Sequence, residues 1–68
     1  MLENWEIIYT TNKLYEAEMV RNIMEDNEIE CVIMNKQDST YGFGDIEVCV
    51  PVENILAAKQ LILKFESE

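Results

Sequence analysis

The residues best suited to bind a ligand lie in one polar segment, residues 35–44. Compact loops of about this length are often functional, and this one offers amide, hydroxyl, carboxylate and ammonium groups. The candidate ligand or partner loop consists of Asn35, Lys36, Asp38, Ser39, Tyr41, Gly42 and Gly44. The alternative is structural: Asn35 and Asp38 would cap turns and the glycines would supply positive φ. Tyr41 would then cover the end of a sheet, together with Phe43.

The combinations of residues that most often carry out catalysis are missing from the chain. There is no histidine, the commonest general base and metal ligand, so Ser-His and Cys-His nucleophile pairs are excluded. The spacing of Gly42 and Gly44 is only a weak phosphate-loop signal. There is also no Cys-x-x-Cys pair for zinc. We therefore expect no catalytic residue, no cofactor and no metal, and we do not expect an enzyme.

The two cysteines are expected to be reduced. Cys31 reads as a small core residue. Cys49 is expected to be more exposed, beside Glu30 and Glu47, whose charges would raise the pKa of its thiol and oppose a redox role.

Met1 is followed by no basic and apolar leader, and the apolar runs are too short to cross a bilayer. These features favour a cytoplasmic location.

The charge of the chain limits the classes of partner that we expect it to bind. Fourteen acidic and five basic residues give a net charge of −9, and the basic residues are scattered along the sequence. Nucleic-acid binding needs a basic face, and an acidic membrane surface would repel the chain. The expected partner is a second copy or another protein, and a small molecule remains possible.

Apolar periodicity predicts five elements in a single domain, residues 1–68. Strands are expected at 5–10, 29–34 and 45–50, and helices at 13–26 and 53–65. Thr11 or Asn12 would cap the first helix, and Asn27 would end it in the left-handed conformation. The expected buried stripes are Leu14, Ala17, Val20 and Met24 with Ile23, then Ile55, Ala58, Ile62 and Phe65 with Leu61.

The order β-α-β-β-α predicts an α+β fold of the ferredoxin-like type. A right-handed crossover makes the first two strands parallel and leaves room for the third strand between them. The expected result is a three-stranded antiparallel sheet of order 1-3-2, with two helices on one face. This is a split β-α-β unit that lacks the last strand.

The alternation of side chains predicts which residues share a face of the sheet. Pairing Ile33 with Ile46 and Cys31 with Val48 keeps the apolar side chains under the helices. In the first strand, Trp5, Ile7 and Tyr9 are assigned to the helix side. The candidate dimer face, on the open side, is then Ile8, Val32, Met34 and Cys49. The free edge of the first strand is the alternative contact.

The sequence also resembles a known bacterial family. The resemblance rests on Trp5 with Ile8-Tyr9-Thr10 and on segments 16–21, 28–31, 35–39 and 48–51 before a helix that contains Ala58. It is similar to a short domain family of unknown function labelled as a putative prokaryotic signal-transducing protein. The family tends to have glycine at the position of Asn27, and asparagine can make the same cap. The resemblance implies a fold like that of the nitrogen-regulatory PII proteins, although the chain has no room for the long PII loop.

Two functions are compatible with these features. The first is a non-enzymatic regulatory or protein-interaction module, acting in signal transduction as a homodimer. The alternative is a sensor that binds a small metabolite at the 35–44 loop. The absence of catalytic groups and the apolar open face favour the first.

Overall fold

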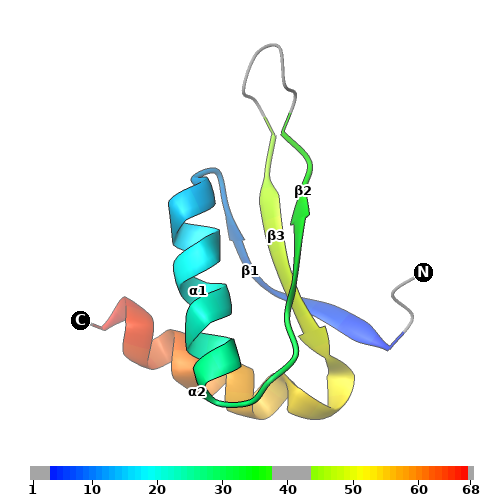
Figure 1. The fold of residues 1–68 in the computed structure, drawn as a ribbon, viewed down its shortest axis with the longest axis vertical. Coiled ribbons are helices and arrows are strands. Elements are labelled where there is room, and N and C mark those ends of the chain that lie inside the picture. Colours follow the sequence, from blue (N-terminus) through cyan, green and yellow to red (C-terminus); the bar gives the residue numbers. More distant parts are fainter. Residues whose placement is uncertain (1–3, 38–43, 68) are drawn as a thin grey trace.

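The chain folds as a three-stranded antiparallel sheet with helices packed on it (Figure 1). The structure is a computed structural model that describes residues 4–37 and 44–67. Its elements are β1 (Trp5–Thr11), α1 (Leu14–Asp26), β2 (Val32–Asn35), β3 (Ile46–Pro51), the 3-10 helix η1 (Val52–Asn54) and α2 (Ile55–Glu66). The strand order is β1-β3-β2. The predicted α+β architecture is therefore confirmed.

The core lies between the sheet and the two helices. Both helices contact β1 and β3. The buried cluster is Ala17, Val20, Met24, Ile29, Ile46, Val48, Val50, Ala58 and Ile62. At its border the rings of Tyr9 and Phe65 meet edge to face, with centroids 6.1 Å apart. Both predicted helix stripes are thus largely correct, but Leu14 is 44% exposed and does not belong to the core.

The hairpin of β2 and β3 keeps the predicted faces in a different register. Ile33 lies opposite Val48, and Val32 lies opposite Cys49. The predicted pairing of Ile33 with Ile46 is wrong by two residues. A slip of two preserves the alternation of faces, so hydrophobic pattern alone could not detect it. The strand β2 is also shorter than predicted, because it begins at Val32.

A bulge in β1 reverses the predicted faces of its first half. Ile7 pairs with Cys49 and Tyr9 pairs with Val48, so Ile8 is an extra residue between them. An extra residue of this kind bends the strand and interrupts its alternation. Tyr9 therefore faces the helices as predicted, whereas Ile7 stands on the open side. Ile8 packs against the core, so its predicted place on the open face is wrong.

The first helix starts at a turn organised by Thr11. The backbone N–H of Lys13 donates to Thr11 Oγ1 at 3.1 Å, and the Thr11 hydroxyl donates to the Glu16 carboxylate. The N-cap residue is Lys13, with no side-chain cap of its own. Of the two predicted caps, Thr11 thus supports the start of the helix, from a position two residues before the N-cap.

The first helix ends in a Schellman motif whose left-handed residue is a glutamate. The N–H of Ile29 donates to Met24 O and that of Glu28 donates to Glu25 O. Glu28 has φ 61°, whereas Asn27 has φ −102°. The predicted left-handed Asn27 is therefore wrong by one residue. Asn27 instead donates its side-chain amide to Ile23 O at 2.8 Å.

Replacing Glu28 with glycine should stabilise the domain. Glycine has no Cβ and adopts the left-handed conformation without the penalty of about 1 kcal/mol that other residues bear. We expect Glu28→Gly to raise the free energy of unfolding by about 1 kcal/mol in urea titrations followed by circular dichroism. The control is Glu28→Ala, which removes the charge but keeps Cβ. Equal stabilisation by both variants would contradict a backbone origin.

Candidate functional site

The open face of the sheet is the larger candidate surface. The pairing places Trp5 and Ile7 of β1 on this side, together with Val32 and Met34 of β2 and Cys49 of β3. Ile7 is 50% exposed, Val32 and Met34 are half-buried and Cys49 is only 2% exposed. Of the predicted dimer face, Val32, Met34 and Cys49 therefore share one side, and Ile7 takes the place of Ile8.

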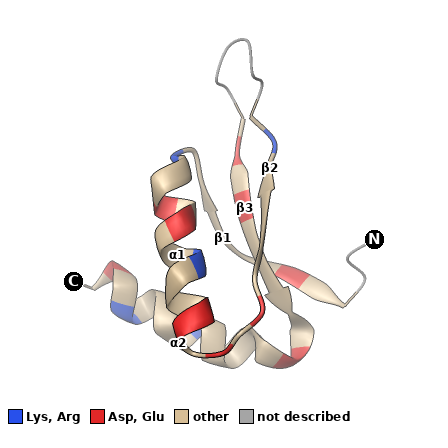
Figure 2. Cartoon of the chain, viewed as in Figure 1, with Lys and Arg blue, Asp and Glu red and all other residues tan. Residues whose placement is uncertain are grey.

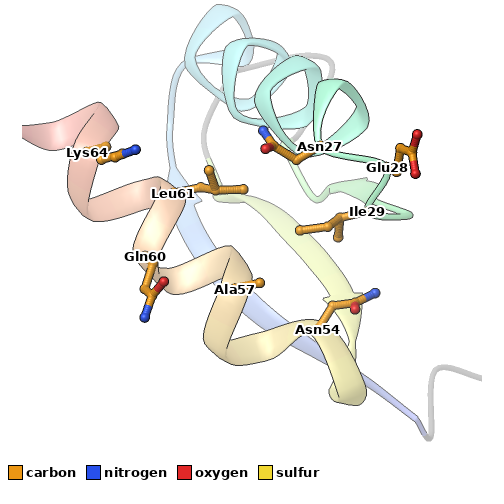
Figure 3. Close-up of a pocket in the computed structure, with 8 residues that line it drawn as sticks. All are labelled: Asn27, Glu28, Ile29, Asn54, Ala57, Gln60, Leu61 and Lys64. Carbon is orange, nitrogen blue, oxygen red and sulfur yellow. The ribbon is translucent and has the colours of Figure 1, made fainter.

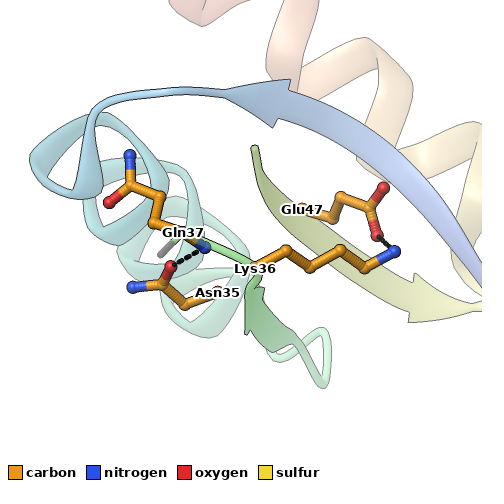
Figure 4. A network of polar contacts seen from close by, with 4 residues as sticks. All are labelled: Asn35, Lys36, Gln37 and Glu47. Carbon is orange, nitrogen blue, oxygen red and sulfur yellow. Dashed lines mark hydrogen bonds and ion pairs between the residues drawn. The ribbon is translucent and has the colours of Figure 1, made fainter. Parts of the chain in front are cut away.

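A carboxylate within this face is paired. Glu47 lies opposite Met34 and Thr10 on the open side, and Lys36 Nζ lies 3.1 Å from its Oε1 (Figure 4). The Glu47 side chain is 16% exposed and that of Lys36 is 57% exposed. Because its lysine end is exposed to solvent, this ion pair contributes little to stability. Its effect here is to reduce the negative charge of a face that is mostly apolar.

Neither cysteine is suited to redox chemistry. Cys31 and Cys49 are both free thiols; Cys31 precedes β2 and packs against the core, whereas Cys49 lies on the open side of β3. Burial raises the pKa of Cys31 to about 11, against an opposing effect of Arg21. Burial also raises the pKa of Cys49, and the charge of Glu47 adds to it. The predicted exposure of Cys49 is wrong because it lies in the central strand, between Ile7 and Val32.

The base of the 35–44 loop is fixed by backbone and side-chain hydrogen bonds. The N–H of Gln37 donates to Asn35 Oδ1 at 2.9 Å (Figure 4), and the N–H of Lys36 donates to Asp45 O at 3.0 Å. Asn35 therefore has the turn-forming role of the structural alternative. Gly44 has φ +116°, and a Cβ there would lie 2.6 Å from Lys36 O. Glycine is required at this position by the close approach of the two backbones.

One further hydrogen bond joins this loop to a distant part of the chain. The side-chain amide of Gln37 donates to Asn12 O, between β1 and α1, at 2.7 Å. This role of Gln37 could not be predicted from the sequence, because no local pattern indicates a contact across 25 residues. The candidate residues Asp38, Ser39, Tyr41 and Gly42 lie outside the described residues.

Comparison with known families identifies a match over most of the chain. A family model described as "Putative prokaryotic signal transducing protein" matches residues 5–66. The chain belongs to that family. The match covers all three strands and both helices, and it confirms the resemblance seen in the sequence. No curated protein and no solved structure matches the chain.

The family description refers to signal transduction and names no enzymatic activity. Within residues 4–37 and 44–67, no three Cys, Asp or Glu side chains gather as they would around a metal ion. In the same part of the chain, no helix is both long and apolar enough to cross a bilayer.

A hollow between the helices was not predicted. It has a volume of about 460 Å³ and lies between the end of α1 and one side of α2 (Figure 3). Ile29, Ala57 and Leu61 contribute its apolar surface, and Asn27 and Lys64 stand on either side of Leu61. Among the described residues, no buried side-chain polar atom lacks a hydrogen-bond partner. The hollow therefore leaves no unsatisfied group that calls for a ligand.

Proposed function

We propose that this chain is a non-enzymatic regulatory module that acts in signal transduction as a homodimer. Two copies would associate through their open sheet faces. The observation that carries the proposal is a row of apolar side chains on that side, all of them at least partly exposed in the part of the chain that the structure describes: Trp5, Ile7, Val32 and Met34. Exposed apolar patches of this kind mark protein interaction sites. The family description supports the signalling role.

The bulge in β1 favours the sheet face over the strand edge. A regular free edge can pair with a second chain by adding a strand. Ile8 interrupts the β1 ladder, and bulges of this kind protect edges against such pairing. Ile7, by contrast, is turned to the open face and is half-exposed there.

The proposed location is the cytoplasm. The chain carries two free thiols, and free thiols persist in reducing compartments. Folding also raises the pKa of both thiols above the usual value, which slows their oxidation. A module of this kind needs no disulfide for stability if a second copy covers its open face.

The dimer is tested by placing a charge on the open face. The variant Ile7→Glu leaves the exposed half of the side chain in water in the monomer, but would bury a carboxylate in the dimer, which is costly. We expect wild-type protein to scatter light with twice the 8.0 kDa mass of one chain. We expect Ile7→Glu to raise the dimer dissociation constant at least tenfold, about 1.4 kcal/mol.

The matched control is Leu63→Glu, which places the same charge at a side chain 66% exposed on α2. It should leave the mass unchanged, because α2 lies on the other side of the sheet. A wild-type chain that stays monomeric at millimolar concentration would refute the homodimer. Equal dissociation of the Ile7→Glu and Leu63→Glu proteins would show that the sheet face is not the interface.

A further inference from the structure

The outer surface of α2 carries two leucines that are not packed in the core. Leu56 is 80% exposed and Leu63 is 66% exposed, although both lie within a regular helix. The helix already buries Ala58 and Ile62 against the sheet. At about 100° per residue, Leu56 and Leu63 lie within about 20° of each other, on the side turned away from that core. They form a second apolar stripe with a spacing of seven residues.

Two lysines flank this leucine stripe. By the same geometry, Lys59 lies about 60° to one side of Leu56 and Lys64 about 80° to the other. Both lysines belong to α2, whose only acidic residue is Glu66 (Figure 2). With two basic residues and one acidic, α2 has a net charge of +1, in a chain whose net charge is −9. Neither lysine forms an ion pair with another described residue.

We propose that this leucine stripe binds an acidic amphipathic helix of another protein. Leucines one heptad apart, with a cation on each side, match a helix whose apolar residues repeat at the same spacing and whose flanks carry carboxylates. The twelve residues of α2 extend about 18 Å, which accommodates about three turns of a partner helix. The site stands on the helix layer, so it does not depend on whether the sheet faces associate.

Charge argues against the two other possible occupants. In a contact between the α2 helices of two copies, four lysines would meet only two glutamates, so the contact would keep a net charge of +2 around one small apolar patch. An anionic membrane is an extended surface, so it would meet the whole chain of net charge −9, whereas a short acidic helix would meet only the basic surface of α2. An acidic amphipathic helix fits this site, because its carboxylates would face the lysines and its apolar side chains would face the leucines.

The test uses a synthetic helix as the probe. The probe is a fourteen-residue peptide with leucines on one face and glutamates beside them; in its matched partner every glutamate is lysine. The peptides are titrated into the full chain, and binding is followed by backbone amide shifts. We expect the acidic peptide to shift the amides of α2 around Leu56 and Leu63, and to bind at least tenfold more tightly than the basic one. We expect the double variant Leu56→Ala/Leu63→Ala to bind the acidic peptide at least tenfold more weakly.

Two further variants separate the apolar and the electrostatic contributions. Met19→Ala removes a 47%-exposed apolar side chain from α1 and should leave binding unchanged. Lys59→Glu/Lys64→Glu should reverse the preference, so that the basic peptide binds more tightly. Circular dichroism verifies that each variant is folded, as expected for exposed positions.

The proposal is overturned if neither peptide binds at millimolar concentration, or if both bind equally well. It is also overturned if the Leu56→Ala/Leu63→Ala variant is monomeric under conditions in which the wild-type chain is a dimer. The leucine stripe would then be a contact between copies. Binding to vesicles of anionic lipid that depends on both leucines would assign the stripe to a membrane instead. Failure of the sheet-face dimer leaves the peptide result unaffected, so the two proposals fail separately.

Discussion

Truncation of Met24 to alanine is expected to remove most of the stability of this domain. The side chain is completely buried between α1 and the sheet, and its carbonyl anchors the end of α1 by accepting from the N–H of Ile29. Methionine-to-alanine changes in a packed core cost about 2–5 kcal/mol. A single core in a domain this small rarely supplies more than about 3–5 kcal/mol. In urea titrations at fixed protein concentration, we therefore expect Met24→Ala to be partly unfolded even without denaturant.

Two controls distinguish lost packing from a general effect of substitution. Met24→Leu nearly conserves volume and should cost less than about 1.5 kcal/mol. Met19→Ala makes the same truncation at an exposed site of the same helix and should change stability by less than about 0.5 kcal/mol. A loss below about 1 kcal/mol in Met24→Ala would mean that the helix-to-sheet packing is looser than described.

The domain should also lose stability as the pH rises from about 9 to about 11. Burial raises the pKa of Cys31 from 9.0 to about 11 in the folded chain. The unfolded chain therefore releases this proton at lower pH than the folded chain does. The resulting stabilisation is complete below pH 9 and is lost as the pH rises to 11. A shift of two pKa units corresponds to at most about 2.7 kcal/mol, and the partial solvent exposure of the thiol lowers the expected loss to about 1–2 kcal/mol. The raised pKa values of Cys49 and Tyr9 act in the same direction.

The contribution of Cys31 is isolated by comparing slopes. Cys31→Val removes the titrating group, so the free energy of unfolding should fall less steeply between pH 9 and 11 than in the wild type. The comparison uses the slope because the substitution also changes packing. Thiolate absorbance near 240 nm provides a second readout, since the part of it that is missing in Cys31→Val should be half developed only near pH 11 in the folded protein. An unchanged slope in Cys31→Val would contradict the assignment.

The sequence predicted the elements and their order because the apolar stripes of the helices are regular. Ala17, Val20 and Met24 repeat with helical spacing, as do Ala58 and Ile62, and all five are buried. The faces of β3 were predicted for a similar reason, since Ile46, Val48 and Val50 alternate with Glu47 and Cys49. Periodicity determines which side chains point inward.

Periodicity did not determine the features that depend on backbone geometry. The bulge at Ile8 could not be predicted because Trp5-Glu-Ile-Ile-Tyr alternates acceptably with or without an extra residue. Ile33 pairs with Val48 and not with Ile46, a shift of two residues from the predicted register. This shift leaves every side chain on its predicted face, so no hydrophobic pattern reveals it. The left-handed residue was assigned to Asn27 on residue preference, while the hydrogen bonds of the turn place it at Glu28.

The candidate site was predicted in part. Val32 and Met34 stand on the open side as expected, and Ile7 was missed because of the bulge. The leucines at 56 and 63 were visible in the sequence, but only the packing of α2 shows that they are surplus to the core. The sequence signal for them is a second apolar stripe on a helix whose first stripe is already wide enough to pack against the sheet.

The strand order has a consequence for the path by which the chain folds. The central strand β3 joins β2 through a short connection, but it meets β1 only after about 35–45 intervening residues have been brought together. Loop-closure entropy and contact order favour the local hairpin and make the docking of β1 the later event. Substitutions in β1 would then mainly accelerate unfolding, whereas those in the hairpin would slow folding. Of the three strands, the one that is synthesised first is thus the last to find its place in the sheet.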